Sequence, residues 1–155
     1  MLVSVRLAEL GIILPEVAPA VGSYLPALVQ GDTILVSGQL PLVAGVLHAN
    51  GTVGEKPGNV SVQLAADCAR IATLNALAAA AAVAGGVDRI ERIARVVGYV
   101  ASEPGFVHQP TVMNGASDLL VQLFGDAGRH VRSAVGVVSL PLGSPVEIEM
   151  TAVLG

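Results

Sequence analysis

The feature that most constrains this chain is a pair of valine-rich runs near its C-terminal end, at residues 131–138 and 146–154. In both runs apolar residues alternate with other residues, which is the pattern of a β-strand that buries one face. The segment 141–145 between them begins and ends with proline and is turn-like. The sequence therefore predicts two strands, each of which buries one face against the rest of the molecule.

These two strands also carry charges. Alternation places Arg132 on the same face of the first strand as two small residues, Ala134 and Gly136, and it places Glu147 and Glu149 together on one face of the second strand. An arginine with small neighbours has room beside it, and its fork of donors suits a carboxylate. Two interpretations are open: an anion pocket at Arg132, or a solvated edge arginine paired with a strand glutamate.

The remaining patterns predict an ordered series of helices and strands. In chain order these are a short amphipathic helix at 4–10, an irregular proline-rich segment at 15–26, strands at 27–29, 33–40 and near 46–47, a helix at 61–84, a strand at 89–100 and a helix at 110–124. Ser61 and Gly85 mark the ends of the long helix, whose predicted apolar stripe runs through Leu64, Cys68, Ile71, Leu74 and Ala78.

The order β-β-β-α-β-α-β-β favours one α+β domain over residues 1–155, a mixed six-stranded sheet with two helices on one face. The other face, which is expected to hold Arg132 and the two glutamates, would need cover from another subunit. Composition agrees, because only 13% of residues are charged and 53% are apolar, whereas about 25% charged residues is usual. The alternative is that many small alanines raise the apolar fraction without making an adhesive surface.

Several function classes receive little support. The net charge is −4 and Lys56 is the sole lysine, so nucleic-acid binding is not expected. The histidines His48, His108 and His130 are far apart in the sequence and show no metal-ligand spacing. The single cysteine, Cys68, suits a reducing cytosol, and the N-terminal residues lack a signal-peptide pattern. We therefore expect a cytoplasmic protein without a membrane anchor or metal.

Four sequence segments together resemble the RidA family, also called YjgF or L-PSP proteins. They are Val-Arg-Ser-Ala-Val-Gly-Val at 131–137, Val-Glu-Ile-Glu at 146–149, Val-Ser-Gly-Gln-Leu-Pro at 36–41 and Gly-Ser-Tyr at 22–24. Glu147 follows Arg132 by fifteen residues, and Ser37 follows Tyr24 by thirteen. The resemblance covers residues 21–153 and implies the chorismate-mutase-like α+β fold, assembled as a homotrimer with pockets between subunits.

The resemblance also implies an activity. RidA-like proteins hydrolyse reactive enamines and imines, such as 2-aminoacrylate and 2-iminopropionate, to 2-keto acids and ammonia without a cofactor. Arg132 matches the arginine that binds the substrate carboxylate, and Glu147 matches the glutamate that positions the attacking water. The positions that match substrate-binding residues are Tyr24, Ser37, Gly38 and Asn114.

Each of these four residues also has a structural interpretation. In these interpretations Tyr24 fills a subunit interface, Ser37 satisfies a backbone group, Gly38 marks a bulge, and Asn114 bonds within its own helix. The chain departs from the family pattern with Ala134, where deaminating members have cysteine, and with longer loops and an extra N-terminal helix. These departures question the substrate more than the reaction. Two rival functions remain: an endoribonuclease that inhibits translation, and a non-catalytic module that binds a small carboxylate.

Overall fold

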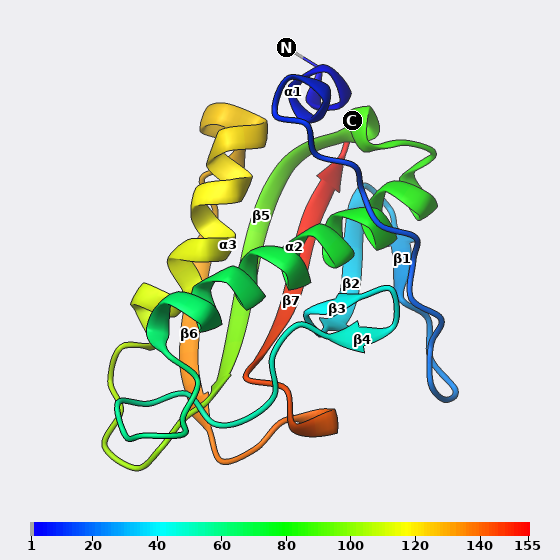
Figure 1. The fold of residues 1–155 in the computed structure, drawn as a ribbon. Coiled ribbons are helices and arrows are strands. Elements are labelled where there is room, and N and C mark those ends of the chain that lie inside the picture. The colour runs from blue at the N-terminus through cyan, green and yellow to red at the C-terminus, as the bar shows by residue number, and fades with distance from the viewer. Residues whose placement is uncertain (1) are drawn as a thin grey trace.

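The computed structural model describes residues 2–155 and shows a mixed sheet with two long helices on one face (Figure 1). In chain order the elements are α1 (Val3–Glu9), β1 (Ala27–Gln30), β2 (Thr33–Gln39), β3 (Leu42–Val43), β4 (Val46–Leu47), α2 (Val62–Ala84), β5 (Ile90–Ala101), α3 (Gln109–Phe124), β6 (Val131–Val137) and β7 (Val146–Leu154). Short 3-10 turns lie at Val87–Arg89, Gly125–Gly128 and Pro141–Gly143. The predicted α+β class is confirmed, and the predicted helices and long strands lie within a few residues of their expected bounds.

The sheet has five strands in the order β1-β2-β7-β5-β6, not the predicted six. Strands β5 and β6 are parallel and the other neighbours are antiparallel. The expected third strand, β4, pairs with β3 in a separate two-stranded ribbon. The reason is a tight turn at Ala44 and Gly45, whose φ values of 49° and 81° fold the chain back on itself before it reaches the main sheet.

Helices α2 and α3 cover the same sheet face: α2 packs over β1, β2 and β7, and α3 packs over β5 and β6 (Figure 1). The Ser61 hydroxyl caps α2 by accepting from the backbone N–H of Leu64 at 3.1 Å, and Gly85 ends it with φ 83°. By length and composition α2 is the one helix among residues 2–155 that could cross a membrane, but 56% of that segment is buried within the domain.

The buried stripe of α2 agrees with the prediction at Cys68 and Ala78 and differs from it at the larger residues. It consists mostly of small residues, among them Ala65, Ala69, Ala72 and Ala76, whereas Leu64 is exposed and Ile71 and Leu74 are half-buried. Alanines have short side chains, so the helix lies close to the sheet and to α3, and its larger residues point to its flanks.

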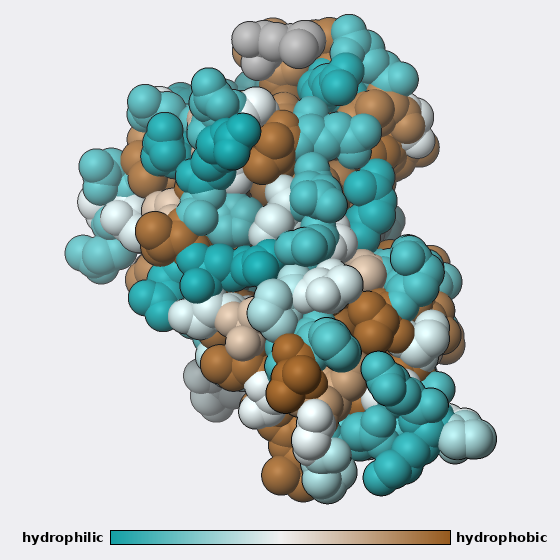
Figure 2. All heavy atoms as spheres, turned by 90° about the vertical axis from the view of Figure 1, so that its left-hand side faces the viewer, coloured by the Kyte–Doolittle hydropathy of each residue, from teal (hydrophilic) through white to brown (hydrophobic). Residues whose placement is uncertain are grey.

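The second sheet face is not covered within one chain. Along β7 the residues Val146, Ile148, Met150 and Ala152 are buried under the helices, so the alternate residues point away from them. Apolar side chains on that open face include Leu28, Leu35, Val131 and Val135, with exposed fractions of 40%, 43%, 66% and 42%. The side of the molecule formed by α3 and β6 shows instead a mosaic of polar and apolar residues (Figure 2).

Candidate functional site

The first part of the candidate site is built where β2 passes β7. The register of β2 shifts between Val36 and Gln39, so the predicted bulge is present. A Cβ on Gly38 would overlap the Glu147 Oε1 atom and lie 2.8 Å from its Cδ. Gly38 therefore leaves the space that the Glu147 carboxylate occupies, so the group that approaches this glycine closely is a side chain of the same chain.

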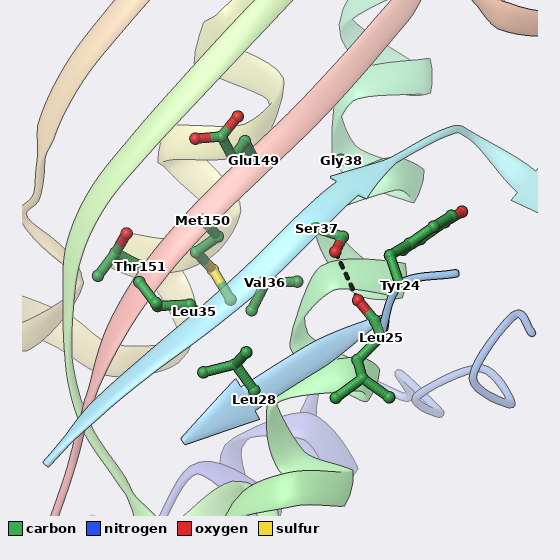
Figure 3. Close-up of a pocket in the computed structure, with 10 residues that line it drawn as sticks. All are labelled: Tyr24, Leu25, Leu28, Leu35, Val36, Ser37, Gly38, Glu149, Met150 and Thr151. Carbon is green, nitrogen blue, oxygen red and sulfur yellow. Dashed lines mark hydrogen bonds between the residues drawn. The ribbon is translucent and has the colours of Figure 1, made fainter. Parts of the chain in front are cut away.

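Two cavities meet at this point. One has a volume of about 360 Å³, and Glu147 is the sole charged residue in its wall, which otherwise includes Pro19, Val21 and Leu142. The other has a volume of about 580 Å³ and is lined by Glu149 and by apolar residues of β1 and β2 (Figure 3). Tyr24 and Gly38 line both cavities. The arrangement presents one carboxylate to each of two largely apolar hollows.

The two carboxylates differ in their surroundings. Burial raises the pKa of Glu147, and the negative charge of Glu149 raises it further. Glu149 is exposed and accepts a hydrogen bond from the Tyr99 hydroxyl at 3.1 Å. Burial, followed by this contact with Glu149, raises the pKa of Tyr99, which keeps the hydroxyl protonated as a donor. Glu147 is therefore a stronger proton acceptor than an ordinary glutamate, and its position is suited to activate water.

Tyr24 and Ser37 are held mainly by backbone groups. The Tyr24 hydroxyl accepts from the Val21 N–H at 3.2 Å, which folds the proline-rich segment over the smaller cavity. The Ser37 hydroxyl donates to the Leu25 carbonyl at 2.6 Å (Figure 3). Ser37 thus satisfies a backbone group, as its structural interpretation predicts, while it also lines the larger cavity.

Arg132 lies in a different part of the molecule. Its register partner on β5 is Val96, which also pairs with the buried Met150 of β7, so Arg132 extends from the sheet face that the helices cover. The prediction that Arg132 shares a face with Glu147 and Glu149 is therefore wrong. The prediction fails because alternation shows which residues share a face within one strand. It does not show which faces of two different strands lie on the same side of the sheet.

The Arg132 guanidinium contacts α3. Nη1 donates to Asn114 Oδ1 at 3.0 Å and to Ser117 Oγ at 3.1 Å, and Nη2 donates to the Pro110 carbonyl at 3.4 Å. Asn114 therefore holds the arginine instead of bonding within its own helix. Because β6 is an edge strand, Arg132 remains exposed despite lying on the helix side.

Two residues of this network, Ser117 and His130, are not among those that the motifs predict. The Ser117 hydroxyl lies 3.0 Å from His130 Nε2, and His130 Nδ1 lies 2.7 Å from the Gly128 carbonyl. The sequence spacing of each residue to a predicted site residue could have indicated both of them. His130 precedes Arg132 by two residues in extended chain, and Ser117 follows Asn114 by one helical turn, so each shares a face with a predicted site residue.

One chain thus contains two half-sites. The first, which we call the carboxylate half-site, consists of Glu147, Gly38, Tyr24 and Ser37. The second, the arginine half-site, consists of Arg132, Asn114, Ser117 and His130. Strand β5 separates β7 from β6, and the two half-sites lie on opposite faces of the sheet. Within residues 2–155, His, Cys, Asp and Glu side chains nowhere form a group of three that could hold a metal ion.

Comparison with known proteins gives one consistent family. Residues 4–154 match the family described as "YjgF/chorismate mutase-like, putative endoribonuclease". Protein TCP17 of Trypanosoma cruzi is 37% identical over 150 residues, which are 95% of this chain and 91% of that protein.

Solved structures agree with this result. A protein from Shewanella oneidensis, described as a "putative endoribonuclease", is 35% identical, with a TM-score of 0.93 over 99% of this chain and 100% of the other. Protein Atu1372 of Agrobacterium tumefaciens, described as having unknown function, is 38% identical, with a TM-score of 0.85 over 99% and 92%. TdcF of Escherichia coli, solved with bound serine, shares the fold at 24% identity, with a TM-score of 0.62 over 90% and 94%.

Proposed function

Because the chain belongs to the YjgF/chorismate mutase-like family, we propose that it hydrolyses reactive enamines and imines, such as 2-aminoacrylate and 2-iminopropionate, to 2-keto acids and ammonia. The observation that carries the proposal is the pair of half-sites. One offers an arginine with unused donors for a carboxylate, and the other offers a basic glutamate in an apolar cavity. A 2-imino acid carries the two features that these groups recognise, a carboxylate and an electrophilic carbon next to it.

The complete site would lie between copies of the chain. Arg132 and Glu147 lie on opposite faces of one sheet, so the β6 edge of one copy must approach the open face of the next for both to reach one substrate. The open face carries exposed apolar residues, including Leu35 and Val131, which such a contact would bury. A ring of three identical contacts closes without a free edge, and we propose a homotrimer.

The chemistry needs no cofactor. The Arg132 guanidinium of one copy would bind the substrate carboxylate in a charge-assisted pair, and Glu147 of the next copy would hold a water against the imine carbon. As the water oxygen forms its bond to that carbon, Glu147 accepts one water proton. Glu147 then gives this proton to the nitrogen, which leaves a hydroxyl and an amine on the same carbon. Glu147 next accepts the hydroxyl proton and passes it to the amine nitrogen, so the carbon–nitrogen bond breaks as the carbonyl forms, and ammonia leaves.

Orientation supplies most of the rate in this scheme, because the imine is already electrophilic. The serine bound to TdcF has a carboxylate and a nitrogen on the adjacent carbon, as the proposed substrate does. The apolar wall around Glu147 would exclude bulk water from the reacting carbon while one water remains on the carboxylate.

The test is suppression of imine trapping. An amino-acid oxidase generates 2-iminopropionate or 2-iminobutyrate in the presence of semicarbazide, and semicarbazone formation is followed with and without the protein. We expect wild-type protein to suppress semicarbazone formation, and we expect the Arg132→Ala variant to leave it unchanged. Arg129→Ala is the matched control, because Arg129 lies three residues before Arg132 in the chain, just ahead of β6, and is paired with Asp126 at 3.3 Å. Semicarbazone formation unaffected by wild-type protein across several amino acids would contradict the proposal.

A second candidate function comes from the family description, which names an endoribonuclease. The net charge of −4 and the single lysine favour the small-molecule substrate instead. Salt-dependent RNA binding, together with RNA cleavage by wild-type protein that Arg132→Ala or Glu147→Gln abolishes, would establish the nuclease. A non-catalytic carboxylate-binding module would lose ligand with Arg132→Ala alone, whereas a hydrolase loses turnover with both substitutions.

A further inference from the structure

The arginine half-site contains a hydrogen-bond chain whose direction is fixed at one end. The Gly128 carbonyl, 2.7 Å from His130 Nδ1, has no proton to give, so Nδ1 carries the ring proton and donates it. In the neutral ring Nε2 is then the acceptor, and the Ser117 hydroxyl at 3.0 Å donates to it. A hydroxyl has a single proton, so Ser117 Oγ presents lone pairs to Arg132 Nη1 at 3.1 Å.

The surroundings of His130 favour this neutral form. Burial lowers the pKa of His130, and the positive charge of Arg132 lowers it further, while the Gly128 carbonyl acts in the opposite direction. The groups that face the ring are Ser117 from α3, Gly128 from the turn after α3 and Arg132 from β6. The adjacent Arg129 is exposed and paired with Asp126. His130 therefore remains an acceptor for Ser117 at neutral pH.

The chain of bonds determines which edge of Arg132 is available. Nη1 uses both of its N–H groups, on Asn114 and Ser117, and Nη2 uses one on the Pro110 carbonyl. The Nε–H and the second Nη2–H have no acceptor within residues 2–155. Nε and Nη2 form one edge of the planar guanidinium, and this edge binds a carboxylate side-on with two parallel hydrogen bonds.

We propose that Ser117 and His130 are positioning residues, which fix the guanidinium of Arg132 so that its Nε–Nη2 edge receives the substrate carboxylate. The inference rests on the proposed function for the identity of the ligand. It assigns a role to two residues that do not touch the substrate: His130 sets the direction of the Ser117 hydroxyl, and Ser117 holds the Nη1 end. The site thereby favours a carboxylate that is presented side-on to the guanidinium.

The first test is equilibrium binding of 2-oxobutyrate by calorimetry, which requires no turnover. Ser117→Ala removes a hydrogen bond to a charged group, and we expect it to weaken binding by roughly 10-fold. Ser117→Thr keeps the hydroxyl and should restore binding, which separates the bond from a general effect on packing. In the imine assay Ser117→Ala should raise KM with little change in kcat, because Glu147 belongs to the other half-site.

The second test reads His130 directly by ¹⁵N-histidine NMR, with the three histidines assigned by substitution. We expect the Nδ1-protonated tautomer in the wild-type protein. Arg132→Ala should raise the pKa of His130, because a neighbouring positive charge is removed. Saturating 2-oxobutyrate should also raise it in wild-type protein, since the bound carboxylate offsets the charge of Arg132, and should leave it unchanged in Arg132→Ala.

Failure of this inference and failure of the proposed function give different results. If Arg132→Ala abolishes 2-oxobutyrate binding but Ser117→Ala binds as wild type does, the positioning role is wrong and the carboxylate site stands. If His130 carries its proton on Nε2, the inferred direction of the chain is wrong. If wild-type protein neither binds 2-oxobutyrate nor suppresses semicarbazone formation, the proposed function fails, and the tautomer and the pKa response to Arg132→Ala decide the positioning role alone.

Discussion

Replacing Gly38 by alanine should inactivate the protein without unfolding it. The new Cβ would overlap the Glu147 Oε1 atom and lie 2.8 Å from Cδ and 3.2 Å from Cγ, so the carboxylate must move by more than about 1 Å to restore ordinary contact. A displacement of that size in a catalytic group lowers the rate by about 10²-fold. Folding should persist, because the contacts are all with a flexible side chain and Gly38 has no positive φ.

The assay is suppression of semicarbazone formation, with the thermal unfolding temperature measured in parallel. The control is the same substitution in a Glu147→Ala background, read by the thermal unfolding temperature, which Gly38→Ala should not lower there because no carboxylate remains to displace. Wild-type activity in Gly38→Ala would refute the account of this glycine. An equal fall in unfolding temperature in both backgrounds would show that the alanine acts on something other than Glu147.

Three further predictions concern stability and reactivity. Gly98→Ala should destabilise the protein by about 1–3 kcal/mol in denaturant unfolding, because its Cβ would overlap the buried Met113 side chain; an unchanged midpoint would contradict this packing. Cys68, whose pKa burial and the charge of Asp67 raise to about 11, should react with a thiol reagent only after unfolding, and fast labelling of native protein would show otherwise. Hydrogen bonding by the Glu55 N–H at 2.7 Å, supported by Lys56 and Asn59, lowers the pKa of Glu103. The ionised Glu103 carboxylate therefore stabilises the loop at 52–60 fully above the unfolded-state pKa of Glu103, and this stabilisation is lost as pH falls through the folded-state pKa. Glu103→Gln should speed amide exchange in that loop at neutral pH. Exchange rates equal to wild type would exclude the tether.

The fold was predictable where the sequence carries local signals. Alternating valines indicated β6 and β7, and Ser61 with Gly85 indicated both ends of α2. The six-stranded sheet was wrong because the partner of a two-residue strand such as β4 depends on the turn at Ala44 and Gly45, whose positive φ at an alanine has no sequence signal. The stripe of α2 was right at Cys68 and Ala78 and wrong at its three larger residues, because close packing of the helix favours small side chains on most of its buried face.

The sequence indicated which residues to consider for a site, but not how the fold arranges them. Glu147 and Gly38 adjoin as the motifs imply, and Asn114 contacts Arg132. The separation of Arg132 from Glu147 depends on the parallel register of β5 and β6, which is a long-range property of the sheet. The spacing of His130 and Ser117 to these residues is a usable signal, but a histidine near a strand arginine can also be solvated or packed in the core. Only the contact with the Gly128 carbonyl shows which nitrogen donates.

The central claim is that Arg132 of one copy and Glu147 of another act on the same substrate, and subunit mixing tests it most directly. Arg132→Ala and Glu147→Ala proteins are each assayed for imine hydrolysis, then unfolded together in equal amounts, refolded and assayed again. Size-exclusion chromatography confirms that each preparation assembles as wild type does. Each variant alone should be inactive, and random mixing in a closed ring should restore about one quarter of wild-type activity, because about one contact in four joins an intact Arg132 to an intact Glu147. A mixture as inactive as its components would contradict a shared site.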